Sequence, residues 1–253
     1  MERSDILAEL KDVTVSFGKN EKKKTVLNGI TFMIGRGEIV GLAGESGSGK
    51  STIAKAILGM VPVESGSITL NTKAPQMVFQ DPYSSLNPAK TIGWIMQEPL
   101  KLAPNRDPDA ERPDAANRKA RVAEMLKEVG LDESYMIHKP RELSGGQRQR
   151  ICIGTALMTE PELLIADEPV SALDVTIQAQ VLALMKELHE KKNLAMLFIS
   201  HDMRTMYHFC DRILILNKGR IVEEGSPDTL YRNPQHEYTK LLLKSAGITK
   251  KQV

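Results

Sequence analysis

The segment GLAGESGSGKST, residues 41–52, places a glycine-rich turn between an apolar stretch and a stretch with helical periodicity. It fits the pattern G-x-x-x-x-G-K-[ST], in which Lys50 and Ser51 follow the second glycine. Such glycines allow successive backbone N–H groups to turn inward around phosphate oxygens at a helix start, where the helix dipole also favours an anion. A glycine- and serine-rich surface loop is the alternative, but the flanking strand and helix patterns favour a phosphate-binding loop.

The residues of this loop have distinct expected roles. Lys50 is expected to reach the β- and γ-phosphates of a nucleotide, and the hydroxyl of Ser51 is expected to bind Mg²⁺. The expected nucleotide-binding residues of the loop are Gly44, Glu45, Ser46, Gly47, Ser48, Gly49, Lys50, Ser51 and Thr52.

A second chemical feature is the segment LLIADEP, residues 163–169, in which four apolar residues precede two acids. This pattern predicts a buried strand with Asp167 and Glu168 at its carboxyl end. Asp167 is expected to hold Mg²⁺ through water, and Glu168 to orient or deprotonate an attacking water. An acidic helix start before Pro169 is the alternative. The phosphate loop elsewhere in the chain favours the first interpretation.

Two further polar residues follow strand-like segments. Gln80 ends APQMVFQ, residues 74–80, and His201 follows AMLFIS, residues 195–200. Open parallel α/β sheets bind their ligands at the carboxyl ends of the strands. Both residues are therefore candidates for the same site, although an ordinary polar strand end and a structural histidine remain open.

A second possible phosphate-binding helix start occurs in RELSGGQRQRICIGTA, residues 141–156. Ser144, Gly145 and Gly146 precede a helical pattern, and the helix dipole places partial positive charge there. The upstream loop already serves a nucleotide of this chain. The segment is therefore either a glycine-rich helix cap or half of a site that another chain completes.

The overall composition limits the possible classes of protein. The chain has 253 residues, 41% of them hydrophobic, and a net charge of 34 − 32 = +2, which argues against nucleic-acid binding driven by overall charge. No apolar run approaches the roughly 18–20 residues needed to cross a bilayer. The first ten residues lack the apolar core of a signal peptide. We expect a soluble chain in the cytoplasm, with Cys152 and Cys210 as ordinary reduced thiols.

The order of the segments predicts a parallel α/β core interrupted by a mostly helical block near residues 85–160, with a separate antiparallel sheet made by the early alternating strands. Residues 103–118 are rich in Pro and Asp and predict an exposed loop. The expected helices are 52–60, 91–100, a segment around 122–129, 175–190 and one terminal helix that begins at 226–228, and strands at 212–216 and 220–222 are expected to form a hairpin.

Together these motifs resemble the nucleotide-binding subunits of ABC transporters, over almost the whole chain. The resemblance implies a P-loop NTPase (RecA-like) core, an antiparallel β subdomain and an inserted α-helical subdomain. It implies one ATPase domain, 1–253, with the core and β subdomain at about 1–85 and 160–253 and the helical subdomain at about 86–159.

The resemblance also implies roles for individual residues. The family signature would be 143–147, so that Ser144, Gly145, Gly146 and Gln147 bind the γ-phosphate of ATP held by the opposite subunit. Gln80 is similar to the family's Q-loop glutamine, near Mg²⁺ and the transmembrane contact. Residues 171–174 resemble the D-loop, His201 resembles the switch histidine at the γ-phosphate, and Phe17 stands where the family places an aromatic ring against adenine.

Four segments narrow the resemblance to the ATPases of oligopeptide, dipeptide and nickel importers, in their second and shorter type. These segments are GESGSGKST, QMVFQDPYSSLNP, DEPVSALDVTIQAQV and NPQHEYTKLLL. The chain departs from the usual pattern of this family in two ways. The connection from SGSITL, residues 65–70, to Gln80 is short, and His236-Glu237-Tyr238 stands in place of the family's His-Pro-Tyr.

This resemblance implies an ATP-hydrolysing motor subunit that uses ATP and Mg²⁺ at the cytoplasmic face of the cell membrane. The implied partners are a second ATPase subunit, expected to be a different chain in a head-to-tail dimer, and transmembrane permease subunits. A solute-binding protein would act indirectly, and no nucleic acid is expected. A di- or oligopeptide is the expected cargo. Nickel or a metal chelate is the alternative, and a soluble non-transport ABC ATPase and a non-enzymatic nucleotide-binding regulator are further alternatives.

Overall fold

The structure is a computed structural model, and it describes residues 5–18, 23–72, 75–102 and 114–248. Its centre is a six-stranded sheet in the order β5-β6-β7-β3-β8-β9. All neighbouring pairs are parallel except β8 and β9, which form the predicted antiparallel hairpin. The strands are β3 (Ile39–Ala43), β5 (Gln76–Val78), β6 (Leu163–Asp167), β7 (Ala195–Ser200), β8 (Arg212–Asn217) and β9 (Arg220–Gly225).

The strands at the centre of this sheet are apolar because both of their faces are covered. Every residue of β3, β6 and β7 is buried, as is typical of parallel strands between two layers. One face packs against α5 (Gly145–Leu157), α6 (Val175–Lys192) and α7 (Met203–Phe209). The other face packs against α1 (Lys50–Ile57) and a second sheet.

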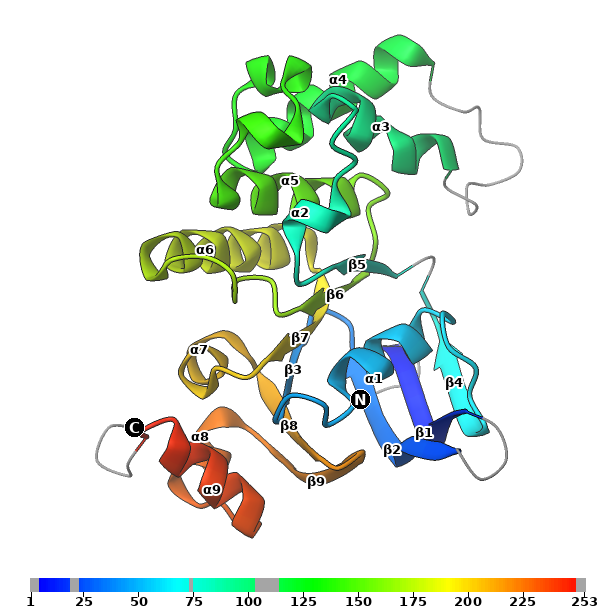
Figure 1. Ribbon diagram of the computed structural model, residues 1–253, viewed down its shortest axis with the longest axis vertical. Coiled ribbons are helices and arrows are strands. Elements are labelled where there is room, and N and C mark those ends of the chain that lie inside the picture. Colours follow the sequence, from blue (N-terminus) through cyan, green and yellow to red (C-terminus); the bar gives the residue numbers. More distant parts are fainter. Residues whose placement is uncertain (1–4, 19–22, 73–74, 103–113, 249–253) are drawn as a thin grey trace.

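The second sheet is antiparallel and three-stranded, with the order β2-β1-β4. Its strands are β1 (Ile6–Phe17), β2 (Lys24–Gly35) and β4 (Ser65–Leu70). Inward-facing residues such as Leu10, Ile30 and Ile34 are fully buried with Ile53 and Ile57 of α1. The predicted separate antiparallel sheet is therefore confirmed, and Figure 1 shows it beside α1.

The inserted block is helical and lies at one end of the molecule (Figure 1). Its α-helices are α2 (Pro82–Ser85), α3 (Ile92–Leu102), α4 (Ala115–Glu128) and α5, with short 3₁₀ turns at Glu133–Ile137 and Pro140–Glu142. Helix α5 packs closely because Gly154 has no side chain: a Cβ there would lie 3.1 Å from Met96 and 3.2 Å from Met125. The block thus shares one apolar core with the parallel sheet.

Several element boundaries differ from the sequence predictions. Residues 115–118 belong to α4 instead of the predicted loop, because the Asp114 side chain accepts a hydrogen bond from the Asn117 N–H at 2.7 Å and starts the helix early. The rest of the predicted loop, 103–113, lies outside the described residues. Helix α1 spans Lys50–Ile57, earlier than the predicted 52–60, with Gly59 at φ 67° just beyond its end.

Two further differences concern the last quarter of the chain. Helix α7 was not predicted, and Asp202 caps its start. The predicted terminal helix is two helices, α8 (Pro227–Arg232) and α9 (Glu237–Ser245), because Pro234 interrupts the helical segment between them. None of the helices within the described residues is both long enough and apolar enough to span a membrane.

The hairpin turn between β8 and β9 joins both sheets to the glycine-rich loop. The Gly219 N–H donates to the Ser48 carbonyl at 3.0 Å, and the Gly219 carbonyl accepts from the Asn28 N–H of β2 at 2.8 Å. A Cβ on Gly219 would lie 2.1 Å from the Val26 carbonyl, so glycine is required at this contact. The loop is therefore held by the core sheet and by the antiparallel sheet together.

Candidate functional site

A pocket of about 710 Å³ lies where the carboxyl ends of β3, β5, β6 and β7 meet. The sequence analysis predicted most of its lining, which includes the glycine-rich loop and three polar residues that follow strands. Residues of α9 and one residue of β2 complete it. The lining residues are Val26, Gly44, Glu45, Ser46, Gly47, Gly49, Lys50, Ser51, Thr52, Gln80, Glu168, His201, Leu242 and Ser245.

The loop leaves the start of α1 uncapped. The N-cap residue is Gly49, at φ 113°, and no side chain caps the helix. A Cβ at Gly49 would lie 2.7 Å from Leu27 Cδ2, and one at Gly44, at φ 155°, would lie 2.3 Å from the Leu216 carbonyl. Glycine is therefore required at both positions, and the first N–H groups of α1 remain available to an anion.

Lys50 points its ammonium back into the loop. Its Nζ donates to the carbonyl oxygens of Gly44 at 2.8 Å and Glu45 at 2.9 Å. The residue is only 6% exposed, and this burial lowers the pKa of Lys50, while Glu168 and Asp167 oppose the shift through their charges. A buried cation of this kind gains most from an anion bound beside it.

Asp167 and Ser51 bring two oxygen groups together near the start of α1. Asp167 is 7% exposed, and its carboxyl is hydrogen-bonded to the Ser51 side chain. Burial raises the pKa of Asp167, the Ser51 hydrogen bond opposes that shift, and the nearby Glu168 charge adds to it. A carboxylate beside a hydroxyl is a donor set that suits Mg²⁺, which prefers oxygen ligands.

Glu168 is held by residues from both neighbouring strand ends. Its Oε2 accepts from Gln80 Nε2 at 3.1 Å, and its Oε1 lies 3.2 Å from His201 Nδ1. Its backbone has φ 48°, a left-handed conformation that costs a residue with a side chain on the order of 1–3 kcal/mol. Its N–H donates to the Ile199 carbonyl at 2.9 Å, which holds this conformation. Three residues predicted separately from the sequence thus meet at one carboxylate.

The second glycine-rich helix start, at α5, does not line this pocket. Ser144 caps α5: its Oγ accepts from the Gln147 N–H at 3.3 Å, and Gln147 Oε1 accepts from the Ser144 N–H at 2.8 Å. Gly145 and Gly146 allow close packing, because a Cβ on Gly146 would lie 2.5 Å from Ile177 of α6. Within one chain, Ser144, Gly145, Gly146 and Gln147 are therefore apart from the candidate site.

Phe17 is also not among the residues that line the pocket. It ends β1, pairs with Lys24 and is 44% exposed. Val26 of the neighbouring strand lines the pocket instead. The role of Phe17 at an adenine ring stays a prediction.

Among the residues of the phosphate loop, the Ser48 side chain faces the interior of the protein, with its Oγ buried.

Helix α9 contributes residues that the sequence analysis did not assign to the site. Leu242 and Ser245 line the pocket, and the Tyr238 hydroxyl accepts a hydrogen bond from the Glu45 N–H at 3.1 Å. These residues follow the loop by about 190 positions, and no local pattern indicates that contact. The segment NPQHEYTKLLL carried a family resemblance but no indication of its place in the fold.

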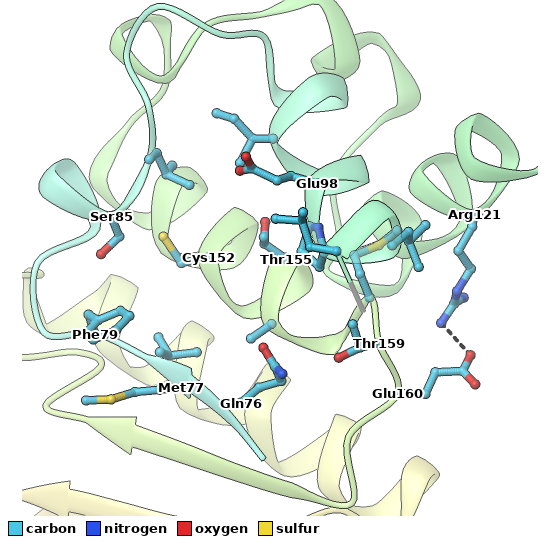
Figure 2. Close-up of a pocket in the computed structure, with 18 of the residues that line it drawn as sticks. Gln76, Met77, Phe79, Ser85, Glu98, Arg121, Cys152, Thr155, Thr159 and Glu160 are labelled. Atoms are coloured by element: carbon cyan, nitrogen blue, oxygen red, sulfur yellow. Dashed lines mark hydrogen bonds and ion pairs between the residues drawn. The ribbon is translucent and has the colours of Figure 1, made fainter. Parts of the chain in front are cut away.

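A larger groove of about 1120 Å³ lies between strand β5 and the helical block (Figure 2). Met77 and Phe79 line it from the strand, Cys152 and Thr155 line it from α5, and the ion pair of Arg121 with Glu160, at 3.0 Å, lies at one side. Apolar side chains remain exposed at this groove, including Phe79 at 43% and Leu102 at 69%. Such a concave, partly apolar surface is typical of a protein-binding site. It adjoins the first pocket, because Phe79 is next to Gln80 in sequence.

Comparisons with known proteins agree with this geometry. A family model described as ABC transporter matches residues 27–171. The chain is 42% identical over 272 residues to the oligopeptide transport ATP-binding protein OppF of Salmonella typhimurium, covering 98% of this chain and 80% of that protein. It is 41% identical over 261 residues to OppF of Streptococcus pyogenes serotype M1, covering 97% and 83%. A solved dimeric, post-hydrolysis structure of the ATP-binding cassette MJ0796 with ADP and Pi matches with a TM-score of 0.76 and 28% identity, covering 87% of this chain and 99% of that one.

Proposed function

This chain belongs to the ABC transporter family, and from that premise we propose that it is the ATP-hydrolysing motor subunit of an importer for di- or oligopeptides. The observation that carries the proposal is the arrangement around Glu168. Gln80 and His201 hold its two carboxylate oxygens beside the phosphate loop, where a water molecule would attack a terminal phosphate.

The proposed reaction is the hydrolysis of ATP to ADP and phosphate. The uncapped start of α1 and Lys50 bind and neutralise the phosphates. Ser51 and Asp167 would hold Mg²⁺, Gln80 is a further candidate ligand, and the ion would supply charge neutralisation at the phosphates. Glu168 orients the water or accepts its proton, and His201 contacts the γ-phosphate. Because phosphoryl transfer involves little covalent chemistry by the protein, these residues act by positioning and by charge.

We propose that the site is completed by a second ATPase subunit in a head-to-tail dimer. In support, the α5 start with Ser144, Gly145, Gly146 and Gln147 is outside the chain's own pocket, so it is free to contact the nucleotide of a partner. The matched MJ0796 structure is itself a dimer with ADP and Pi. The partner is proposed to be a different ATPase chain, because the resemblance is to importers that pair two types.

The groove in Figure 2 is proposed to receive a transmembrane permease subunit at the cytoplasmic face of the membrane. One wall is strand β5, which leads directly to Gln80, and the other is the helical subdomain, proposed to span about residues 86–159 of one ATPase domain. A movement of that subdomain towards the sheet would change the groove and the pocket together. A solute-binding protein would act only through the permease.

The cargo is proposed from the relatives, whose names describe oligopeptide transport. The test is uptake into vesicles that contain the complete transporter, assembled with its own permease subunits and solute-binding protein. We expect ATP-dependent uptake of di- or oligopeptides and none of Ni²⁺. The matched control is the same complex with Glu168→Gln in this chain, which should bind ATP and show little uptake. Uptake of Ni²⁺ instead of peptide would overturn the cargo, and recovery of this chain with ribosomes instead of permeases would overturn the transport role.

A further inference from the structure

Helix α9 forms one wall of the proposed ATP pocket, and it contacts the phosphate loop directly. Leu242 and Ser245 line the pocket, one turn apart on the same face of the helix. One turn before them, the Tyr238 hydroxyl accepts the hydrogen bond from the Glu45 N–H at 3.1 Å. The contact is therefore made by a helix that lies alongside the pocket and not by an isolated side chain.

The hydrogen bond from Glu45 acts on the same peptide group that holds Lys50. The N–H of Glu45 and the carbonyl of Gly44 belong to one peptide unit, and that carbonyl accepts from Lys50 Nζ at 2.8 Å. Because a peptide unit is planar, fixing its N–H also fixes the direction of its carbonyl. Gly44 has no side chain to restrict rotation of this unit, so hydrogen bonds on its two sides set its orientation.

The orientation of this peptide decides where the Lys50 ammonium points. An ammonium group has three N–H donors, and the Gly44 and Glu45 carbonyls take two of them. The third is then directed by the first two and is available to a phosphate oxygen. If the Gly44–Glu45 peptide rotated, the ammonium would lose one of its two fixed partners.

Helix α9 is anchored well enough to act as a support. The Glu223 carboxylate accepts from the Gln235 N–H at 2.7 Å and the His236 N–H at 3.0 Å, just before the helix starts. His236 Nδ1 in turn accepts from the Tyr238 N–H at 3.1 Å. Thr239 and Leu243 are buried against the core. Burial also raises the pKa of Tyr238, so its hydroxyl stays neutral.

We propose that Tyr238 is a positioning residue for nucleotide binding: by holding the Gly44–Glu45 peptide, it directs the Lys50 ammonium towards the phosphates. This inference rests on the proposed function, since it takes the pocket to bind ATP. It assigns a role to the segment around His236-Glu237-Tyr238, which the proposed hydrolysis reaction does not use.

The test is the Tyr238→Phe variant of the full chain, which removes the hydroxyl and keeps the ring. Binding of ATP is measured by calorimetry in the presence of Mg²⁺, and the apo protein is melted in parallel. We expect the Kd for ATP to rise about fivefold, the factor for one ordinary hydrogen bond, with the melting temperature nearly unchanged. In hydrolysis assays the KM for ATP should rise by a similar factor while kcat changes little, as expected for lost ground-state binding.

Two control variants separate positioning from general packing. Tyr207→Phe removes another tyrosine hydroxyl, which donates to Asp228 at 2.8 Å and does not contact the loop. Leu241→Ala changes an exposed residue of α9 that does not line the pocket. Both should leave the Kd for ATP within twofold of the wild type.

The outcomes distinguish this inference from the proposed function. If the wild-type chain does not bind ATP, both are overturned. If the wild type binds ATP and Tyr238→Phe binds it within twofold as tightly, the positioning role alone is overturned. The same role is overturned if Tyr207→Phe weakens ATP binding as much as Tyr238→Phe does, because the loss then reflects the stability of this part of the fold.

Discussion

Two helices of this molecule begin with a glycine-rich sequence of the kind that can bind phosphate. The backbone N–H groups of their first turns find hydrogen-bond partners in different ways. Helix α1 starts at Gly49 with no side-chain cap, so its first N–H groups face the pocket. Helix α5 starts at Ser144, where the Ser144 and Gln147 side chains satisfy two backbone N–H groups reciprocally. The first start needs a ligand for its donors, whereas at the second the N–H groups of Ser144 and Gln147 are satisfied within the chain and only those between them need a partner.

The side chains around the two helix starts also differ. Lys50, Asp167 and Glu168 lie at α1, so cationic and acidic groups are both present for a nucleotide and its metal. At α5, Gln147 donates to the Tyr135 hydroxyl at 2.7 Å, and Leu173 lies against Gly145. A similar glycine-rich sequence is thus accompanied by a lysine and two carboxylates only at α1, since Arg148 in the first turn of α5 donates to the Pro140 carbonyl. This difference supports a nucleotide at α1 and a contribution to a partner's nucleotide at α5.

The largest effect should come from Glu168→Gln, which tests whether the chemistry belongs to the α1 side. We expect hydrolysis to fall about a thousandfold, because an amide cannot accept the proton of water. The Kd for ATP should stay within about threefold of the wild type, since the phosphate-binding groups are unchanged. Phosphate release and calorimetry measure the two quantities, and size-exclusion chromatography should show an ATP-trapped dimer. Near wild-type hydrolysis would remove Glu168 from its proposed role.

Ser144→Arg should have the next largest effect, and it tests whether α5 acts on another chain. The bulky cation at the start of α5 should leave this chain's own ATP affinity nearly unchanged, because Ser144 does not line its pocket. Closure over the partner's ATP should be blocked, and hydrolysis by the assembled complex should fall about a hundredfold. The matched control is Ser134→Arg, an exposed position in the neighbouring 3₁₀ turn. A large loss of ATP binding in the isolated Ser144→Arg chain would instead place α5 in the chain's own site.

A smaller effect is expected from a change of pH on the Mg²⁺ requirement of hydrolysis, through the Asp167 carboxyl near the start of α1. Because burial raises the pKa of Asp167, this carboxyl takes up a proton at a higher pH than an exposed aspartate, whose pKa is about 3.9. A protonated carboxyl binds Mg²⁺ poorly. The Mg²⁺ concentration needed for half-maximal hydrolysis should therefore rise as the pH falls towards the pKa of Asp167. In contrast, the apo protein should gain stability from Asp167 as the pH falls, because the folded state binds that proton more tightly than the unfolded state.

The control for this pH effect is Asp167→Asn, which cannot titrate. In this variant the dependence of the Mg²⁺ requirement on pH should become shallow, while the requirement itself is raised at every pH. Titrations of hydrolysis with Mg²⁺ at a series of falling pH values measure both. An unchanged pH dependence in Asp167→Asn would assign it to another group.

The smallest effect should come from Ser144→Ala, which removes the cap that distinguishes α5 from α1. The free energy of unfolding should fall by about 1 kcal/mol, as is usual for the loss of an N-cap side chain. ATP affinity of the isolated chain should not change. Urea unfolding measures the first quantity, with Ser67→Ala as a control, because Ser67 is an exposed residue of strand β4. A change below about 0.3 kcal/mol would mean that water or a neighbouring group replaces the cap.

The parts of the site that the sequence predicts are those coded by adjacent residues. The phosphate loop needs its glycines, Lys50 and Ser51 in a fixed local order, and Asp167 and Glu168 end an apolar strand, so each is visible as a pattern. The meeting of Gln80, Glu168 and His201 follows from the rule that parallel strands present their carboxyl ends at one edge. The antiparallel sheet was likewise visible as alternation of apolar and polar residues.

Other features could not be predicted because they depend on contacts between distant segments. The Tyr238 contact with Glu45 joins α9 to a loop 193 residues earlier, and a tyrosine on an amphipathic helix gives no sign of the N–H group that donates to it. Helix α7 was missed because its seven residues are too few for a periodic pattern to stand out. The left-handed backbone conformation of Glu168 is held by the hydrogen bond from its N–H to the Ile199 carbonyl, and the residue types involved do not predict this bond.

The turn at Gly219 has a mechanical consequence for the whole molecule. Its hydrogen bonds to Ser48 and Asn28 fasten the phosphate loop to both sheets, so the loop, the core and the antiparallel sheet form a stiff base. The helical block packs against the parallel sheet through one shared apolar core, and the chain enters and leaves the block next to β5 and β6 (Figure 1). We therefore expect the phosphate loop to keep its position relative to both sheets if the helical block shifts against the core. The groove of Figure 2 lies between strand β5 and that block, so such a shift would change the width of the groove while the phosphate loop stays in place.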